Sequence, residues 1–531
     1  MKILNIKSTQ LLAILVVVFT GFSCSDKFFD EQAGERITPD QHYKSVIDAQ
    51  NSLAGAFVPL QAVLPKLIMI DGLRSDMMTP TSTADAYLKD LNNQVLSFDN
   101  PYLDASDYYK VIVNANEALA NLAKIAAVDR DFDDYTMKYT KGALVGLKSW
   151  TYLTLIRLYG QAALIDDNLV ALPENLNQTI LTKDAMLDVL IEGLLPYIPS
   201  TEELTQKLEL RFTNFMNNKA VLGELYLEKG DYANAAIYLK MAIESYKNST
   251  DIYKVNSYSN EAWKTMFLGG ESGTGSIPPA NNIAPSENIS VMAYDQNEGQ
   301  FNPLARWILP TDQFMVQPSQ ILINDYKTQI PLKGTNGDVY RGIGATIDTT
   351  SSGVYYINKY SINKAEPFSS DITISRAADL HLLLAEALNR NGESATALII
   401  LNQGFKPELK KPALYTKWSK NLGIRGRAYL QSVVVPDSAF LTPGAVKKSP
   451  LTGADRINYI EDLIMTERSM ELAFEGKRWF DLVRVAKRRQ DPAYLANKVA
   501  AKFTNTAEGD AVRAKLMNEN NWYLPFKKEI K

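Results

Sequence analysis

The sequence predicts a mainly α-helical fold of tetratricopeptide-like helical hairpins, interrupted by an irregular, loop-rich region with a few short strands. Two stretches, 216–246 and 376–404, repeat the residue spacing of a tetratricopeptide hairpin. Between them, residues 253–375 contain a long run of Gly, Ser, Pro and Asn and lose the helical pattern. At 531 residues the chain exceeds a single core, so an extended repeat array or two domains is expected.

The composition is that of a globular protein with a mildly acidic charge. Hydrophobic residues make up 46% of the chain and charged residues 22%, which excludes wholesale disorder. The formal net charge is −4 without a basic tract, so nucleic acid is not an expected partner. Two histidines and one cysteine are too few for the usual His or Cys metal sites. No cofactor is expected, and the sequence leaves open whether calcium supports the loop-rich region.

The first 23 residues are predicted to be a signal peptide. Lys2 and Lys7 precede an apolar run at residues 11–19, and small residues follow it. A permanent membrane helix needs about 20 apolar residues, so this run is too short to span a bilayer. Cys24, the only cysteine, comes next and resembles the cysteine of a bacterial lipobox, which becomes lipidated. The alternative is an ordinary signal peptide with a chance cysteine.

Three acidic residues, Asp26, Asp30 and Glu31, follow this cysteine. Such a cluster resembles the export tag of surface lipoproteins in Bacteroidetes-type bacteria, which implies the outer leaflet of the outer membrane. Several acyl chains would hold the protein there firmly, because each buried methylene contributes roughly 0.8 kcal/mol. Residues 24–40 are therefore expected to form a lipidated tether.

The first half of the mature chain is predicted to be helical with one long loop. Apolar residues recur at helical spacing over residues 40–64, and Pro65 is expected to end that helix. Further helices are expected at residues 107–127 and 139–159. Between the first two helices, residues 71–101 contain Gly, Pro and clusters of Ser, Thr and Asn, and are expected to form a loop.

The two predicted hairpins share one spacing. Their key residues lie at mutual offsets of 3, 9, 4 and 3, with turns at Gly230-Asp231 and Asn391-Gly392. In tetratricopeptide hairpins, small residues at this spacing lie where the two helices cross. Generic antiparallel helices are the alternative, and they would still give an all-helical bundle. The residues are Gly223, Tyr226, Ala235, Leu239 and Ala242 in the first hairpin, and Ala385, Leu388, Ala397, Leu401 and Gly404 in the second.

The region between the hairpins is expected to be irregular. Short strands are predicted at residues 289–294 and 353–360. A helix is predicted at the end of 309–324, and a turn at 337–341. Long irregular segments rarely persist in a compact domain without a function, so ligand contacts are sought here and in the first loop.

Near the C-terminus, residues 467–484 are predicted to form a helical hairpin that turns at Gly476. Glu467, Glu471 and Glu475 recur every four residues and therefore share one helix face. We interpret this stripe as a partly buried ion network that is neutralised mainly from the following helix. The alternative is a catalytic carboxylate cluster. The residues expected to complete the hairpin are Arg478, Trp479, Phe480, Asp481 and Arg484.

With these elements the chain resembles the SusD/RagB family of outer-membrane nutrient-binding lipoproteins along essentially its whole length. One departure is the insertion at residues 404–423, between Leu401-Asn402 and an arginine-rich stretch that starts at Ile424. The segments that carry the resemblance are 24–31 (CSDKFFDE), 157–165 (RLYGQAALI), the repeat around Gly223, 337–342 (GDVYRG), 376–392 (RAADLHLLLAEALNRNG), the hairpin at 467–484 and 522–531 (WYLPFKKEIK).

The resemblance implies a bundle of tetratricopeptide hairpins packed against an irregular cap. The helical face would lie as a lid on a SusC-like TonB-dependent transporter, and the cap would capture a glycan or, in the RagB branch, peptides. No covalent step is required, so the protein is not expected to be an enzyme. The expected organisation is a signal peptide (1–23), a lipidated tether (24–40), an N-terminal helical part (41–252), the cap (253–375), a tetratricopeptide-like hairpin (376–404), a cap insertion (405–455), and a C-terminal hairpin and tail (456–531).

Ligand contacts are expected from aromatic rings and an arginine on loops, because rings stack on sugar C–H surfaces and polar side chains bind hydroxyl groups. These side chains are chosen by loop position and residue type. The expected ligand-binding residues are Arg74, Tyr87, Phe98, Tyr102, Tyr294, Trp307 and Tyr340.

Three other functions compete with glycan capture. A secreted glycoside hydrolase would need two carboxylates about 5–10 Å apart. A peptide-binding protein and a scaffold that contacts only other proteins are the remaining alternatives. The loop acids considered for hydrolysis are Asp71, Asp76, Asp104 and Asp295.

Overall fold

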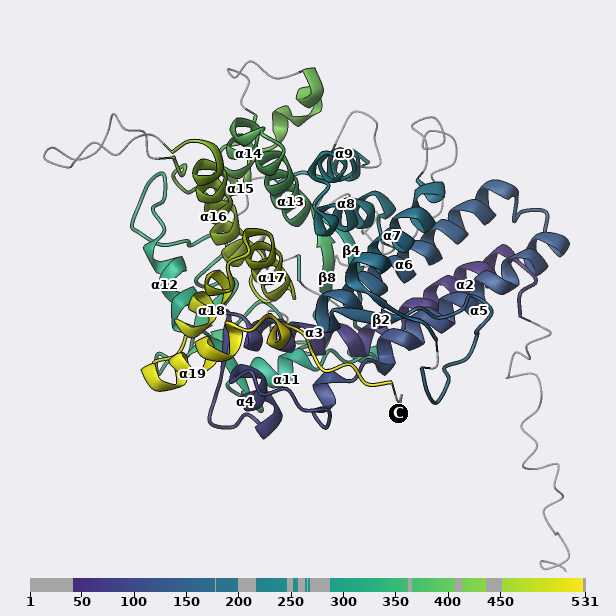
Figure 1. Ribbon diagram of the computed structural model, residues 1–531, viewed down its shortest axis with the longest axis horizontal. Helices are drawn as coiled ribbons and strands as arrows, with labels where there is room; N and C mark the ends of the chain where they lie inside the picture. The colour runs from purple at the N-terminus through teal and green to yellow at the C-terminus, as the bar shows by residue number, and fades with distance from the viewer. Residues whose placement is uncertain are drawn as a thin grey trace, which may run out of the picture.

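The computed structural model shows a mainly helical protein with small two-stranded sheets (Figure 1). This confirms the fold class expected from the sequence. The predicted signal peptide, Cys24 and tether lie outside the described residues. The structure describes residues 42–176, 178–198, 216–245, 252–255, 263–264, 266–267, 287–361, 365–405, 413–435 and 451–528.

The N-terminal part is a group of long helices, which extend along the right of Figure 1. Helix α5 (Ser106–Val128) packs against α6 (Asp134–Tyr159) and against α2 (Val46–Phe57). Helix α7 (Lys183–Leu194) covers the other side of α6. The helices expected at 107–127 and 139–159 are thus confirmed. Helix α6 ends at Gly160, whose φ of 72° lies in the left-handed region that favours glycine.

Pro65 does not end a helix, contrary to the prediction. It lies inside α3 (Leu60–Arg74), which also occupies the start of the expected loop. A proline within a helix leaves the carbonyl four residues earlier without its usual N–H donor. Here that carbonyl belongs to Gln61, and it accepts a hydrogen bond from the hydroxyl of Tyr294 at 2.9 Å. A distant side chain therefore supplies the missing donor, and the helix continues.

The first predicted hairpin is formed by α8 (Asn218–Lys229) and α9 (Tyr232–Ile243). Gly230 follows α8 with a φ of 83°, which allows the chain to reverse. A Cβ atom on Gly223 would lie 2.7 Å from Cγ of Leu239. The two helices therefore approach so closely that only glycine fits at this crossing, as the repeat spacing predicts.

The second hairpin, α13 (Ala377–Arg390) and α14 (Ser394–Leu401), turns at Gly392, whose φ is 89°. Helix α13 packs against α9, so the two hairpins are neighbours (Figure 1). The side chains between them form a second apolar core that also includes Ile460 and Ile464. The stacked hairpins thereby make a rigid body on which loops can be held.

The irregular cap contains short antiparallel strand pairs. Strand β4 (Asn288–Met292) pairs with β8 (Ile372–Arg376), and β6 (Ile347–Thr349) with β7 (Tyr355–Ile357). The strands expected at 289–294 and 353–360 are confirmed in shortened form. The remaining elements of this region are β5 (Val316–Pro318), η6 (Gln296–Glu298), α11 (Leu304–Ile308) and α12 (Gln320–Thr328).

The C-terminal part adds four helices. Helix α16 (Gly453–Glu471) and α17 (Arg478–Arg489) form the predicted hairpin, followed by α18 (Pro492–Ala500) and α19 (Thr506–Leu516). Gly476 has a φ of 72° at the turn of the hairpin. The remaining short elements are β1 (Met78–Pro80), α4 (Ala86–Asn92), η2 (Pro101–Leu103), β2 (Gln161–Ala163), β3 (Ile180–Thr182), η3 (Leu195–Tyr197), η7 (Ala413–Lys420), α15 (Ile424–Arg427) and η8 (Glu519–Trp522).

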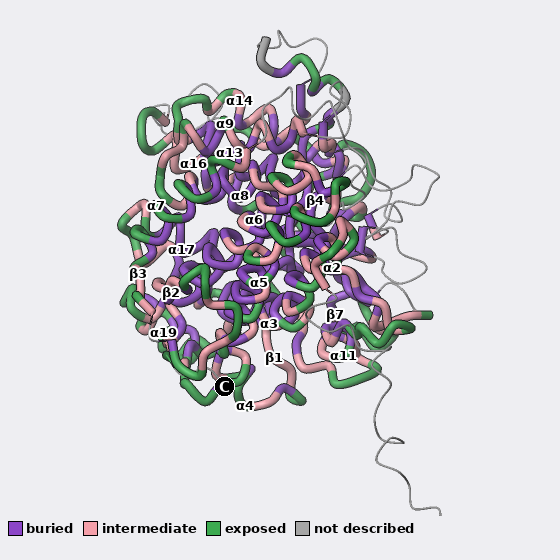
Figure 2. The backbone as a smooth tube through the Cα atoms, turned by 90° about the vertical axis from the view of Figure 1, so that its right-hand side faces the viewer, coloured by how far each residue is buried: buried purple, intermediate pink, exposed green. Residues whose placement is uncertain are grey.

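The largest apolar core joins the N-terminal helices to the cap and the C-terminal hairpin. Figure 2 shows the buried backbone running through the interior and the exposed segments at the loops. Two helical stretches, Val46–Arg74 and Pro101–Val128, are long and apolar enough to cross a membrane by composition. Their inward residues, such as Leu53, Ile70 and Ile112, belong to this core, so their apolar faces are used in packing.

Candidate ligand-binding site

Strand pairing brings two loops together that are more than 200 residues apart in the sequence. Strand β1 pairs with β5, placing the loop after β1 beside the segment before β5. The backbone N–H of Thr81 donates to the carbonyl of Met315 at 2.9 Å. The hydroxyl of Thr83 donates to the carbonyl of Phe314 at 2.7 Å. Helices α4 and α11, which belong to these two segments, accordingly lie near one another at the bottom of Figure 1.

Two side chains fix the shape of the first loop. Asp85 accepts the backbone N–H of Leu88 at 2.8 Å and thereby caps α4. Asn100 accepts the backbone N–H of Tyr102 at 3.0 Å and donates to the carbonyl of Tyr87 at 3.2 Å. Asn100 is buried, and we call its two hydrogen bonds the clamp. The clamp fixes the backbone of both tyrosines.

The hydroxyl of Tyr102 donates to the second carboxylate oxygen of Asp85 at 3.1 Å. Burial and the neighbouring Asp85 carboxylate raise the pKa of Tyr102 well above its ordinary value, so its hydroxyl stays protonated. The ring of Tyr102 meets the edge of Trp307, on α11, with centroids 6.1 Å apart and an interplanar angle of 72°. We call these two rings, together with Tyr87, whose backbone Asn100 ties to that of Tyr102, the aromatic platform.

A second aromatic pair, Phe301 and Phe368, meets α11 through Arg306. Phe301 is 58% exposed, and its ring centroid lies 6.1 Å from that of Phe368. The guanidinium of Arg306 lies 5.4 Å from the centroid of Phe368 and pairs with Asp312 at 3.7 Å. The sequence prediction missed Phe301 and Phe368. For Phe301, its place in the short Gly299–Pro303 loop just before Trp307 was the available signal.

Phe98, also on the first loop, lines a cavity of about 340 Å³ rather than touching the platform rings. Its ring is 56% exposed. The cavity also borders Asn100, so the loop that carries the platform forms one of its walls. Four of the predicted residues, Tyr87, Phe98, Tyr102 and Trp307, are thus brought to this part of the surface.

Arg74 is a core residue and not a surface residue, which corrects the expectation that it meets a ligand. Its guanidinium lies 4.0 Å from the ring centroid of Trp479 and is fully buried. Nε donates to the side chain of Gln94 at 3.0 Å, and Nη1 donates to the carbonyl of Trp522 at 3.0 Å. Desolvation lowers the pKa of Arg74 to about 9. Its role here is to tie α3 to the C-terminal segments.

Tyr294 and Tyr340 also lie away from the platform. Tyr294 is buried, and its hydroxyl is bound to the carbonyl of Gln61, as described above. In this conformation its ring is not accessible to a ligand. Tyr340 is half-buried and packs on Tyr429 with ring centroids 5.9 Å apart. We therefore leave both out of the proposed site.

The loop acids considered for hydrolysis have structural partners. Asp71 accepts the backbone N–H of Trp479 at 2.6 Å, and Asp76 pairs with Arg478 at 2.7 Å. Both acids are buried. Asp104 accepts the backbone N–H of Ser106 at 3.0 Å. Asp295 likewise caps the short helix η6. Each of these four carboxylates is therefore engaged in a structural hydrogen bond or ion pair.

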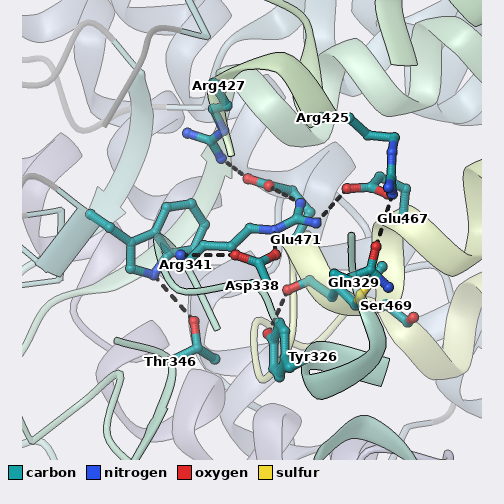
Figure 3. Close-up of polar contacts among 12 residues, drawn as sticks. Tyr326, Gln329, Asp338, Arg341, Thr346, Arg425, Arg427, Glu467, Ser469 and Glu471 are labelled. Atoms are coloured by element: carbon teal, nitrogen blue, oxygen red, sulfur yellow. Dashed lines mark hydrogen bonds and ion pairs between the residues drawn. The ribbon is translucent and has the colours of Figure 1, made fainter. Parts of the chain in front are cut away.

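The acidic stripe of the C-terminal hairpin is a buried ion network (Figure 3). Arg341 pairs with Glu467 at 2.5 Å and, through its other nitrogens, with Glu471 at 2.7 Å and Asp338 at 2.5 Å. Arg425 pairs with the second oxygen of Glu467 at 2.5 Å. Burial raises the pKa of Glu467, but the two arginines outweigh it and hold the pKa below its ordinary value. The stripe is therefore ionised and paired.

The rest of the network follows the same pattern. Arg376 pairs with Glu471 at 2.8 Å and with Glu475 at 2.9 Å. Lys359 pairs with Glu475 at 2.7 Å, and Arg427 pairs with Glu471. Side chains from the cap and from the arginine-rich stretch that starts at Ile424 thus meet the helical hairpin in its interior.

The expectation that the following helix neutralises the stripe is wrong. Arg478 of α17 pairs instead with Asp76, and Arg484 pairs with Glu386 at 2.6 Å. The bases that meet the stripe come from residues 341–376 and 425–427, which sequence spacing could not identify. The structural interpretation itself is correct, because each of the three glutamates is held by basic side chains.

The fold and the surface together define a class of protein: stacked helical hairpins packed against a loop-rich cap, with aromatic rings where the first loop meets that cap. Residues 288–530 match the model of the SusD family. SusD-like protein P38 of Formosa agariphila is 23% identical over 92% of this chain and 92% of its own length. These matches agree with the expected resemblance to the SusD family, whose model covers residues 288–530 of this chain.

Solved structures share the fold of this chain. A SusD superfamily protein from Bacteroides thetaiotaomicron aligns with a TM-score of 0.61 and 18% identity, over 91% of this chain and 96% of that one. A laminarin-binding SusD-like protein aligns with a TM-score of 0.54 and 18% identity, over 88% of this chain and 96% of that one. At these identities the similarity establishes the shared fold.

Proposed function

We propose that this protein captures oligosaccharide or polysaccharide at the cell surface and delivers it, chemically unchanged, to a SusC-like TonB-dependent outer-membrane transporter. The observation that carries the proposal is the aromatic platform. Tyr102, in η2, and Trp307, on α11, come from distant segments of the chain and are fixed in an edge-to-face arrangement. Rings held in this way present apolar faces to the C–H surface of a sugar without an ordering cost.

Polar groups beside the rings can form hydrogen bonds with the hydroxyl groups of a sugar. Asp85 touches the hydroxyl of Tyr102, and Arg306 lies next to Trp307 on α11. The laminarin-binding name of one solved relative supports a carbohydrate ligand. The structural roles of the loop acids support capture without hydrolysis.

Surface attachment through Cys24 and delivery to a transporter are part of the same proposal. The predicted signal peptide, the single cysteine after it and the match to the SusD family model support them. Radiolabelled palmitate should enter the protein in its native host, and Cys24→Ala should abolish the label. Co-purification of a transporter with the wild-type protein tests the second part.

Affinity electrophoresis through gels that contain single polysaccharides tests the capture. The panel holds laminarin, starch, xylan, mannan, pectin and alginate. The proposal predicts retardation by at least one of them, without release of reducing ends from that polysaccharide. Release of reducing ends would show an enzyme. Peptides that co-purify with the protein, together with no retardation in any gel, would favour the peptide-binding alternative.

A further inference from the structure

The cavity beside the platform has no role in the function proposed so far. Its volume of about 340 Å³ is at the lower end of the range of small-ligand pockets, roughly 300–1,000 Å³. It therefore has room for one or two sugar rings but not for a longer chain. The lining residues that matter here are Lys66, Phe98, Asp99, Asn100, Asp104 and Lys527.

The cavity and the platform share a structural element. Asn100 lines the cavity, and its side chain is the clamp that fixes the backbone of Tyr87 and Tyr102. The exposed ring of Phe98 lies two residues before this clamp, and Tyr102 lies two residues after it. Because Phe98 and Asn100 of this loop both line the cavity, the loop connects the platform to the cavity.

The polar lining of the cavity is balanced in charge. Two lysines, Lys66 and Lys527, face it together with two aspartates, Asp99 and Asp104. Lys66 also pairs with Asp107 at 3.0 Å, just outside the lining. An apolar ligand would strip water from these charges, and an anionic one would meet carboxylates. Neutral hydroxyl groups can donate to the aspartates and accept from the lysines.

The walls of the cavity are held by internal contacts. The hydroxyl of Tyr159 donates to the carbonyl of Leu103 at 2.8 Å, and its ring meets Phe526 with centroids 5.9 Å apart. The backbone N–H of Leu176 donates to the carbonyl of Lys528 at 2.8 Å. The C-terminal segment is thus fastened on both sides of Lys527. A preformed site of this kind binds with little ordering cost.

We propose that this cavity is a second sugar-binding subsite that accepts one or two neutral sugar units from the chain held by the platform. Phe98 stacks on a sugar ring, and the lysines and aspartates bind its hydroxyl groups. This inference rests on the proposed function and deepens it, because it assigns part of the ligand to a defined pocket and specifies that part as uncharged.

Saturation-transfer NMR with the methyl glycosides of glucose, galactose, mannose and xylose tests the subsite. At least one glycoside should show saturation transfer from the wild-type protein. Phe98→Ala and Lys527→Ala should each weaken that signal, because they remove the stacking face and a hydroxyl-binding cation. Val95→Ala is the matched control, since Val95 is an exposed residue of the same loop outside the cavity lining. The control should keep the full signal.

Two results would overturn the inference: no transfer to any of the four glycosides, or a full signal from both cavity variants. The gel panel separates this failure from that of the proposed function. If a polysaccharide is retained but the cavity variants change nothing, the subsite is refuted and polysaccharide capture stands. If glycosides bind in the cavity but no polysaccharide is retained, the subsite is supported as a sugar site and the proposed capture fails.

Discussion

Replacement of Arg478 by alanine should destabilise the fold strongly and leave ligand affinity unchanged. Nε and Nη2 of Arg478 bind the two carboxylate oxygens of Asp76 at 2.8 and 2.7 Å, and Nη1 donates to the carbonyl of Met465 at 3.0 Å. Arg478 is 7% exposed and Asp76 4%. This bidentate pair joins the C-terminal hairpin to the segment that precedes the platform loop.

The magnitude follows from the charge that is left behind. Removing one partner of a buried ion pair costs about 3–5 kcal/mol, because the remaining charge stays desolvated. Unfolding entropy is about 2.1 cal/mol/K per residue, so a chain of this length that unfolds as one unit should lose about 3–5 °C in melting temperature.

Urea unfolding followed by circular dichroism measures the loss in the free energy of unfolding. The matched control is Arg513→Ala, because Arg513 pairs with Asp510 at the surface, where both side chains are more than half exposed. That control should cost less than about 1 kcal/mol. The double variant Arg478→Met with Asp76→Asn should recover part of the loss, since it removes the unpaired charge. Arg478→Ala as stable as the control, or a stable variant with weakened polysaccharide binding, would refute the reasoning.

Two further predictions concern stability. Burial lowers the pKa of Lys502 to about 7, so between pH 7 and about 10 the unfolded chain binds a proton that the folded one does not. The free energy of unfolding should therefore rise with pH across this window, and Lys502→Met should reduce that rise in urea titrations at pH 7 and 9.5. Gly223→Ala should cost about 1–3 kcal/mol, because its Cβ would clash with Leu239. Gly193→Ala, where nothing lies within 4 Å of the added Cβ, should not destabilise the protein when both variants are unfolded in urea.

The sequence predicted those parts of the fold that depend on local signals. The helices of the two hairpins follow from apolar spacing, and their turns fall at Gly230 and Gly392, which both take positive φ. Close crossing at Gly223 was also predictable, because the repeat places a small residue there. Each of these features is set by residues near one another in the sequence.

The errors come from partners that are distant in the sequence. Pro65 stays inside a helix because Tyr294 supplies the missing donor from the cap. Arg74 is buried because Trp479 and the C-terminal segment enclose it. The acidic stripe is neutralised from the cap, and residue spacing within one hairpin could not show this.

The candidate site was predictable by residue type and only partly by position. Tyr87, Tyr102 and Trp307 were chosen as loop aromatics, and the β1–β5 pairing is what brings the two loops together. That pairing involves only three residues on each strand, which leaves no readable signal in the sequence. Phe368 was missed for the same reason, since its place beside α11 depends on tertiary packing.

The most direct test of the account is calorimetric titration of Trp307→Ala with the polysaccharide that retards the wild-type protein most strongly. Loss of a central aromatic contact should weaken binding by about tenfold or more, equivalent to about 1.4 kcal/mol. Tyr340→Ala, which removes a half-buried cap aromatic that packs on Tyr429, should bind like the wild type. Unchanged affinity in a folded Trp307→Ala protein would contradict the central claim that the aromatic platform holds the glycan.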